Sequence, residues 1–597
     1  MAIARRLSAR LRRRGARVGR HARAAAFAVA IGLIVAAAEI VFRLVVEWVS
    51  GQTLGAVAGD VWRAAAAAPG WLIVATTTCG GLICGLIANR FMPNGQPVGI
   101  AQAIEAAALR GGRMSLRVGL IGAGLNAFAL GCGASAGREG PVVHLGASIA
   151  AWTARIFRFD RGMARTLLGC GAAAAVAAAF NAPLAGSLFA AEVVLGHYAL
   201  GAFAPIVLSA VGATILSRAW YGDFPAFTIP QVGEIQSALE FPAFVLLGLV
   251  AALVAVAFAL GAETVRAQAV RAKLPIWARP AVAGFAVGIV GLSLPQVLGV
   301  GYEATDEALL GAFSLQMLVA ILIAKLICSS LCIGLGFGNG VFGPALVLGA
   351  MTGCAFGMIA VSAVPPAYAS PVVAYGVVGM AAVSAAILNA PVSTILIVFE
   401  MTGDYGLTIA VMTGVVVATL GAQLALGRSF FHRQLRAQGI DVTDGAAAAE
   451  LAERVVGDVL SAPAPQTFAT TPAENLRQRI AYESAGAIFV VGSDGKLLGE
   501  ITLHDLAAYD DPDSPDFGRI AGKTAGAVAR RPAAEFQLRT PLTVAAARCQ
   551  ASHETIFPVV YADDDRRLAG YVWGVDVIRA YVSALEAMRR AERSGEV

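Results

Sequence analysis

Charged residues are scarce in this sequence. Asp, Glu, Lys and Arg make up 14% of its 597 residues, whereas hydrophobic residues make up 57%. A soluble globular domain carries about 25% charged residues. The shortage excludes a chain that is soluble throughout and indicates a membrane protein. It ends near residue 428, where a mixed and charged sequence begins, so we predict a membrane domain followed by a soluble tail.

Acidic residues are absent from the first 23 residues, which contain nine arginines. A signal peptide begins in this way, but the apolar segment that follows is long, contains Glu39 and Arg43, and lacks a clear cleavage site. We therefore expect a basic arm on the cytoplasmic side of the membrane. The arm explains most of the net charge of +6, so we expect no nucleic-acid partner.

Metal and catalytic signatures are also missing. The eight cysteines and six histidines show no ligand spacing, so we expect the cysteines to be small buried apolar residues and His144 to pack between helices. There is no nucleophile elbow and no zinc box. GNGVFG (338–343) matches G-x-G-x-x-G, but no strand of a βαβ unit leads into it. We predict neither an enzyme nor a metal site.

The apolar part of the chain contains a weak internal repeat with matched spacing. FNAPLAGSLFAAEV (180–193) aligns with LNAPVSTILIVFEM (388–401), and each copy follows a glycine-rich motif, GREGP (137–141) or GVFGP (340–344). Two such halves are typical of duplicated units that are inverted in the membrane. The aligned pairs are Asn181 with Asn389, Pro183 with Pro391, and Glu192 with Glu400.

The glycine-rich motifs predict loops that turn into helices. Glycine allows close backbone approach, and proline suits the first helical turn. Helix N-termini carry unpaired amides and partial positive charge, so two of them near the bilayer midplane form a site for a small anion. Glu139 can occupy the anion's place and leave when it is protonated or displaced. A salt bridge of Glu139 with Arg138 is the weaker alternative, because adjacent side chains diverge.

These motifs resemble the CLC family of chloride channels and anion/proton antiporters. GREGP, GVFGP (the family's G-x-F-x-P), NAPLAG (181–186) and EMTGDY (400–405) carry the resemblance, which covers about residues 24–440. It implies an all-α membrane domain with inverted repeats and broken helices, a homodimer with one anion path per subunit, and an external gate at Glu139. The backbone amides of Arg138, Glu139, Gly140, Val341 and Phe342 would line the path.

Two hydroxyls of the family's central anion site are missing. Where the family usually reads G-S-G-I-P, this sequence has PVGIA (97–101), which puts Val98 at the serine position, followed by Gly99. RSFFHRQL (428–435) puts Phe431 at the family's tyrosine. We expect a site of backbone amides and apolar walls, and a weakened preference for chloride, which is strongly hydrated.

The resemblance also bears on the coupling to protons. Antiporters of the family generally carry an inner glutamate directly after the glutamate that matches Glu192. Here that next residue is Val193, as in channel members, and valine cannot relay protons. This favours passive conduction, although some antiporter branches, including fluoride exporters, depart here too.

The soluble tail resembles a pair of CBS repeats, which many family members carry on the cytoplasmic side. GKLLGEITLHDL (495–506) and RRLAGYVWGVDVI (566–578) match the ends of the two repeats. Thr502 and Asp505 fit a site for the phosphate and ribose of an adenine nucleotide. In the second repeat Trp573 replaces the hydroxyl residue, while Asp576 remains. A structural role in supporting the dimer is the equal alternative.

We therefore predict an all-α polytopic membrane protein with a C-terminal α+β CBS pair. The expected parts are a basic arm (1–23), a membrane domain (24–440, with halves at about 24–220 and 240–440), a linker (441–454), two CBS repeats (455–510 and 525–585) and a tail (586–597).

The predicted function is a voltage- or pH-gated, chloride-type anion channel of the cell (inner) membrane, with both termini cytoplasmic and no required cofactor. The first alternative is an antiporter that exchanges chloride, nitrate or fluoride for protons by another route. A second is a nucleotide-sensing regulatory protein with a non-conducting membrane anchor. The intact Glu139, Gly340 and Phe342 argue against this second alternative.

Overall fold

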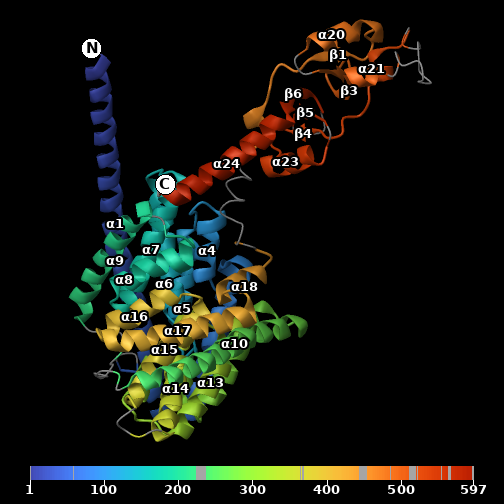
Figure 1. Cartoon of the computed structure of the whole chain (residues 1–597). Coiled ribbons are helices and arrows are strands. Elements are labelled where there is room, and N and C mark those ends of the chain that lie inside the picture. The colour runs from blue at the N-terminus through green and yellow to red at the C-terminus, as the bar shows by residue number, and fades with distance from the viewer. Residues whose placement is uncertain are drawn as a thin grey trace. The chain divides into compact units, whose positions relative to one another are not determined.

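The computed structural model describes residues 2–594 (Figure 1), except 58–59, 199, 224–226, 228–234, 236, 364, 366–368, 441, 443–453, 484–485, 508, 510–519, 521, 553 and 562–565. It divides into two compact units, one that ends at Val442 and one that spans Thr443–Ser594. Nearly all of the predicted linker (441–454) lies outside the described residues.

The first unit is helical. Among its described residues, eight helices are long and apolar enough to cross a membrane. Its α-helices are α1 (Ala2–Leu54), α2 (Val61–Ala67), α3 (Gly70–Phe91), α4 (Ile100–Leu109), α5 (Leu116–Gly131), α6 (Glu139–Ile156), α7 (Arg161–Phe180), α8 (Pro183–Phe189), α9 (Leu200–Tyr221), α10 (Phe241–Arg271), α11 (Arg279–Gly291), α12 (Tyr302–Leu309), α13 (Leu315–Leu335), α14 (Phe342–Ala363), α15 (Val372–Leu388), α16 (Pro391–Thr402), α17 (Tyr405–Leu426) and α18 (Phe430–Arg436).

Short 3₁₀ turns and one π-helical turn interrupt or connect these helices. The 3₁₀ turns are η1 (Pro93–Gly95), η3 (Ala238–Glu240), η4 (Ile276–Ala278) and η5 (Pro295–Val297), and the π-helical turn is η2 (Ala190–Leu195). Helix α1 runs without a break from Ala2, so the predicted basic arm is the start of the first helix.

The internal repeat has a direct counterpart in the structure. Helices α7 and α15 both end at an asparagine in the left-handed region, Asn181 with φ 58° and Asn389 with φ 56°. Both following helices, α8 and α16, have proline in the first turn. Asparagine tolerates a positive φ and proline is pre-organised for a first turn, so each Asn-Ala-Pro motif ends one helix and starts the next.

Corresponding helix pairs also touch at glycines in both halves. A Cβ added to Gly146 of α6 would lie 2.4 Å from the carbonyl oxygen of Gly171 in α7. A Cβ added to Gly349 of α14 would lie 2.5 Å from the carbonyl oxygen of Gly379 in α15. Neither position can carry a side chain unless the helices move apart, and close backbone approach of this kind is typical of membrane helices.

The repeated glutamates bind the two halves together. Glu192, in η2 after α8, accepts hydrogen bonds from the first turn of α16, and Glu400 in α16 accepts them from the first turn of α8. Each carboxylate therefore caps the other half's helix and offsets its partial positive charge. The donors are the amides of Leu184 (3.0 Å) and Ala185 (2.8 Å) toward Glu400, and the amides of Val392 (3.1 Å) and Ser393 (2.8 Å) with the Ser393 hydroxyl (2.7 Å) toward Glu192.

The second unit contains two small sheets of the same design. In each, the first strand is parallel to the middle strand, the third is antiparallel to it, and the middle strand is buried throughout. The elements are η7 (Val456–Val459), β1 (Gln466–Phe468), η8 (Ala473–Asn475), α20 (Leu476–Tyr482), β2 (Ala487–Val491), β3 (Leu497–Thr502), α21 (Leu503–Ala507), α22 (Ala525–Val528), β4 (Phe536–Gln537), α23 (Leu542–Gln550), β5 (Ile556–Val560), β6 (Leu568–Trp573) and α24 (Gly574–Ser594).

The repeats exchange their leading segments, which differs from the predicted boundaries. Val456 lies in the core of the second repeat, and the Gly457 amide donates to the Leu538 carbonyl at 2.9 Å. Ala525 lies in the core of the first repeat, where its amide donates to the Thr471 carbonyl at 2.7 Å. Each core is therefore completed by a segment that precedes the other repeat, an arrangement that contiguous ranges such as 455–510 and 525–585 do not capture.

Candidate functional site

The two glycine-rich motifs meet in the first unit. The Gly137 amide donates to the Gly340 carbonyl at 2.6 Å, just before α6 begins at Glu139 and α14 begins at Phe342. A Cβ on Gly340 would lie 1.9 Å from the Gly137 carbonyl oxygen, so the contact requires glycine. The expectation that two helix N-termini from different halves face each other is confirmed by this geometry.

The Glu139 carboxylate lies at the N-terminus of α14. Its side chain is 1% exposed, and its Oε2 accepts a hydrogen bond from the Gly343 amide at 3.1 Å. Its Oε1 accepts a hydrogen bond from the Tyr302 hydroxyl of α12. A carboxylate held by a first-turn amide and a hydroxyl occupies the kind of place that a small anion would take. The amide that binds it belongs to Gly343, one residue beyond the predicted Phe342.

Arg138 does interact with Glu139, contrary to the expectation that these adjacent side chains diverge. Its Nε lies 3.6 Å from Glu139 Oε1, and its guanidinium lies over the Tyr302 ring at 4.8 Å from the centroid. Arg138 is the N-cap of α6, and its contact with the Tyr302 ring keeps the guanidinium beside the carboxylate. The site thus contains a paired charge, which lowers the cost of burying Glu139.

A cavity of about 390 Å³ lies against this group on one side. Arg43, Glu47, Arg138, Tyr302 and Glu303 are among its lining residues. The lining carries both signs of charge, and it includes Tyr302 and Arg138, which contact the Glu139 side chain. A hydrated anion in this cavity would therefore be adjacent to the residues that hold Glu139.

Asn339, which directly precedes Gly340, connects the paired motifs to the segment before α4. The Asn339 side-chain amide donates to the Pro97 carbonyl at 3.2 Å, and the Asn339 backbone amide donates to the Asn126 side chain at 2.9 Å. The Gly99 amide, predicted to face the anion, instead donates to the Gln102 side chain at 2.8 Å. An anion at this amide would have to displace the Gln102 oxygen.

The two positions that lack hydroxyls are buried and apolar. Val98 is 4% exposed and contacts α5, where a Cβ on Gly122 would lie 2.6 Å from its Cγ2. It also lines a cavity of about 160 Å³ that includes His144, which is itself buried. Phe431 is 3% exposed in α18, a helix that contacts α4, and it packs edge-on against Phe430.

The predicted lining residues Gly140, Val341 and Phe342 are also buried. The Phe342 ring lies 4.9 Å from the Phe180 ring and 6.4 Å from the Phe189 ring, measured between centroids. The first residue of α14 thus packs against aromatic rings of α7 and α8. Among the cysteines, seven are buried as expected, whereas Cys79 is exposed.

Val193 lies within the π-helical turn η2 and is 7% exposed. The neighbouring Glu192 carboxylate is held by two amides and a hydroxyl of α16. No acid therefore stands at position 193, and the acid next to it is already bound.

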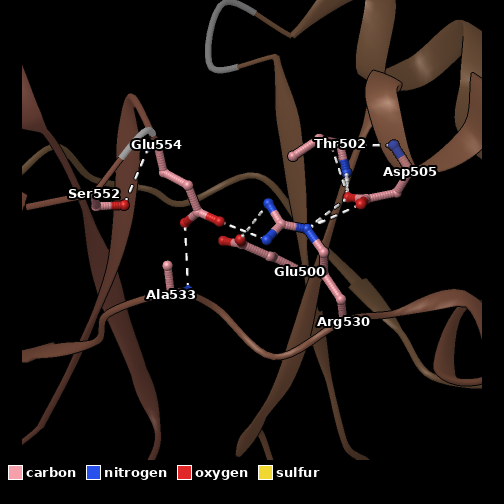
Figure 2. A network of polar contacts seen from close by, with 7 residues as sticks. All are labelled: Glu500, Thr502, Asp505, Arg530, Ala533, Ser552 and Glu554. Atoms are coloured by element: carbon pink, nitrogen blue, oxygen red, sulfur yellow. Dashed lines mark hydrogen bonds and ion pairs between the residues drawn. The ribbon is translucent and has the colours of Figure 1, made fainter.

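The three predicted nucleotide residues all have intramolecular partners, and Figure 2 shows those of Thr502 and Asp505. Asp505 Oδ2 accepts hydrogen bonds from the Thr502 hydroxyl at 2.7 Å and the Thr502 amide at 2.8 Å. Its carboxylate also pairs with Arg530 Nε at 2.9 Å. Asp576 pairs with Arg579 at 2.9 Å. Helix α21, which follows Thr502, has only five residues. Nucleotide binding remains a prediction, and it would require Asp505 to exchange partners.

Arg530 joins three carboxylates from the two repeats. Besides Asp505, it contacts Glu500 of β3 at 3.0 Å and Glu554, which precedes β5, at 2.5 Å. Glu500 is 1% exposed, and its carboxylate lies beside both Arg530 and Glu554. Burial, and next the proximity of Glu554, raise the pKa of Glu500 to about 8. Its environment therefore favours the protonated form of the Glu500 carboxyl group over the charged form.

Sequence reasoning missed Tyr302, Gly343 and Arg530. Tyr302 ends the stretch LGVGY (298–302), and nothing in the neighbouring sequence indicates that it contacts Glu139, which lies in another helix. Gly343 stands inside the recognised GVFGP motif, so shifting the expected donor one residue would have found it. Arg530 lies near the start of the predicted second repeat, and only the exchange of segments places it beside Asp505 of the first repeat.

Comparison with known proteins finds both chloride channels and H(+)/Cl(−) exchangers among the similar proteins. Residues 80–423 match the family described as voltage gated chloride channel, and residues 456–511 match the CBS domain family. A protein of Ralstonia nicotianae named as a ClcB-like chloride channel is 32% identical over 413 residues, which cover 68% of this chain and 95% of that protein. The H(+)/Cl(−) exchange transporter ClcA of Vibrio parahaemolyticus is 32% identical over 319 residues, covering 52% and 68%.

A solved structure, that of a eukaryotic CLC transporter, shares the fold. It matches with a TM-score of 0.60 at 19% identity, over 93% of this chain and 98% of the other. The predicted architecture, a membrane domain of broken helices followed by a CBS pair, is thereby confirmed.

The Glu500 cluster predicts a pH-dependent stability of the second unit. The folded chain keeps the Glu500 proton up to about pH 8, whereas an unfolded glutamate loses it near 4.5. The folded state therefore binds more protons between these values, and its stability falls as pH rises toward 8. Glu500→Gln should remove this loss, which is on the order of 2 kcal/mol between pH 6 and pH 8. The loss of stability is measured by hydrogen exchange of the full-length protein, in peptides that cover β2 and β3.

Asp494→Asn is the matched control, because Asp494 is an exposed carboxylate of the same repeat. It should leave the pH dependence as in the wild type. If the wild type and the Glu500→Gln variant lose protection in parallel as pH rises, the cluster holds no proton at neutral pH.

Proposed function

Since this chain belongs to the CLC family, whose members transport chloride-type anions across membranes, we propose that it is a passive anion channel gated by Glu139. The proposal rests chiefly on one observation: the Glu139 carboxylate lies at the N-terminus of α14, bound to the Gly343 amide, where a permeating anion would bind.

Competition between Glu139 and the anion provides the gating step. While the carboxylate occupies the α14 N-terminus, its charge repels an anion and its oxygens use the donors. Protonation removes the charge, and a high anion concentration displaces the group by mass action. Both changes free the amide for the anion, so flux rises at acid pH and with anion concentration.

Val193 and the bound state of Glu192 support passive conduction. A proton relay needs an ionisable group that can release and rebind a proton beside the path. Position 193 has none, and the Glu192 carboxylate is engaged in three hydrogen bonds to α16, including a charge-assisted pair from backbone amides. Moving a proton through Glu192 would break the cap that joins the two halves.

A proton-coupled antiporter is the second candidate. Relatives of comparable similarity include both a named chloride channel and a named H(+)/Cl(−) exchanger, so family membership favours neither. An acid other than Glu192, such as the buried Glu39 in α1, would then have to carry protons. The transported ion would be chloride, nitrate or fluoride.

The remaining expectations follow from family membership. We propose a homodimer in the cell (inner) membrane, with both termini on the cytoplasmic side. The nine arginines among the first 23 residues support that orientation, because basic segments remain on the cytoplasmic face.

The coupling prediction uses purified protein in liposomes under crossed chloride and pH gradients. A passive channel reverses at the anion equilibrium potential, and a chloride gradient moves no protons. A ClcA-type exchanger in the same liposomes serves as the positive control. Stoichiometric proton uptake by this protein would establish the antiporter instead.

The gate prediction concerns Glu139→Gln. The neutral amide resembles the protonated carboxyl group and cannot repel an anion. Flux should lose most of its pH dependence and stay high at neutral pH, measured as chloride efflux from liposomes between pH 5 and pH 8. Glu192→Gln, which alters the helix cap, should keep the wild-type pH profile. A wild-type pH response in Glu139→Gln would rule out Glu139 as the gate.

The selectivity prediction restores a hydroxyl at the central site. A hydrogen bond to a charged partner contributes roughly 1.5–3 kcal/mol, so Val98→Ser or Phe431→Tyr should raise chloride affinity about tenfold or more. Nitrate and thiocyanate should lose their relative advantage. Val98→Ala reduces the side chain to a similar size without a hydroxyl and is the control. Unchanged chloride binding by calorimetry in both hydroxyl variants would show that the path bypasses these positions.

A further inference from the structure

We propose that Tyr302 is a positioning residue for the gate: its hydroxyl holds the Glu139 carboxylate in the closed place, at the N-terminus of α14. This inference rests on the proposed role of Glu139. Neither the repeat nor the motifs of the sequence assign a function to Tyr302. The structure places its hydroxyl on Glu139 Oε1, while the Gly343 amide holds Oε2.

Tyr302 starts α12 after a tightly bent loop. The preceding Gly301 has φ 92°, a conformation that favours glycine, and Gly299 has φ 66°. These bends direct the tyrosine into the interior, where it is 8% exposed. The Phe227 ring packs on the Tyr302 ring with centroids 4.4 Å apart, which restricts its position. The hydroxyl therefore reaches Glu139 from a fixed ring.

A buried lysine fixes the loop that carries Tyr302. Lys325 of α13 is 0% exposed, and its Nζ donates to the carbonyls of Val297 and Gly299, both at 3.0 Å. Hydrogen bonds from a buried charged donor are among the strong ones in proteins. Because these carbonyls stand a few residues before Tyr302, the lysine supports the hydroxyl's position through the backbone.

Arg138 joins the same group without replacing the tyrosine. Its guanidinium stacks on the Tyr302 ring at 4.8 Å and lies 3.6 Å from Glu139 Oε1, beyond hydrogen-bond distance. Arg138 attracts the carboxylate electrostatically, whereas the Tyr302 hydroxyl donates the direct hydrogen bond to Glu139 Oε1. Replacing tyrosine by phenylalanine removes the bond and keeps the ring that Arg138 and Phe227 contact.

The hydrogen bond from the Tyr302 hydroxyl to Glu139, which we call the latch, forms in one state of the gate only. The hydroxyl donates to the carboxylate only while Glu139 occupies its present place, so the bond stabilises the closed arrangement over the open one. A contact made in one state only shifts the balance between the two. Loss of the hydroxyl should therefore favour opening, and a lower proton concentration should suffice to open the path.

Other charged and titratable groups also face this region. They belong to α1, α9 and α12, and they are unchanged when only the Tyr302 hydroxyl is removed. They are Glu39, Arg43, Glu47, Tyr221, Glu303 and Asp306.

The test compares pH profiles of chloride flux for the full-length protein in liposomes. In Tyr302→Phe the pH of half-maximal flux should rise by about one unit or more, a tenfold or greater change in proton concentration, as expected for the loss of one hydrogen bond to a charged group. In the double variant Tyr302→Phe/Glu139→Gln the flux should match that of Glu139→Gln alone, because the hydroxyl then has no carboxylate to hold.

Tyr375→Phe is a matched control, because Tyr375 is a buried tyrosine whose hydroxyl donates to the Glu240 carboxylate at 3.0 Å, in the second half. It should keep the wild-type profile, which separates a specific effect from general loosening. A Tyr302→Phe profile that superimposes on the wild type, or an equal shift in the Glu139→Gln background, would overturn the latch. If Glu139→Gln itself keeps the wild-type pH response, the proposed gate fails and the latch with it.

Discussion

A carboxylate buried among membrane helices needs donors, and most of this structure's first unit can be understood from that need. Glu139 is 1% exposed, and an unpaired charge in such a place costs several kcal/mol. Its oxygens are satisfied by the Gly343 amide at a helix N-terminus and by the Tyr302 hydroxyl. The same donors suit a small anion. The requirement that stabilises the folded protein thus also supports the proposed anion site.

The duplication of the chain supplies this geometry. One helix N-terminus comes from each half, and they approach so closely that Gly137 and Gly340 bond through their backbones. Glu192 and Glu400 repeat the principle at a second place, where each caps the helix of the other half. Glu192 and Glu400 join the helices of the two halves, whereas Glu139, the proposed gate, lies at the α14 N-terminus. The donors differ in kind: Glu139 is bound by one amide and the Tyr302 hydroxyl, whereas Glu400 is bound by two amides of one helix end.

The second unit shows how a familiar motif can serve another purpose. Thr502 and Asp505 have the spacing of a nucleotide site, yet their polar groups bond to each other and to Arg530. Arg530 also contacts Glu500 and Glu554, so it ties the two repeats together. A guanidinium can bind a carboxylate in place of a ribose hydroxyl. Because Arg530 belongs to the same chain as Asp505, it is present at a high effective concentration.

The sequence by itself determined what depends on local chemistry and on counts of residues. Scarce charge indicated the membrane, and the Asn-Ala-Pro and glycine-rich motifs located helix ends, because positive φ, proline and close backbone approach restrict residue type. Those motifs also carried the resemblance to the CLC family. Tertiary structure alone decided which groups meet. Tyr302 reaches Glu139 from a distant helix, Arg530 reaches Asp505 through exchanged segments, and Arg138 turns back to its neighbour over an aromatic ring. A hydroxyl or guanidinium can bond to many acceptors, and only the packing of segments remote in sequence selects one.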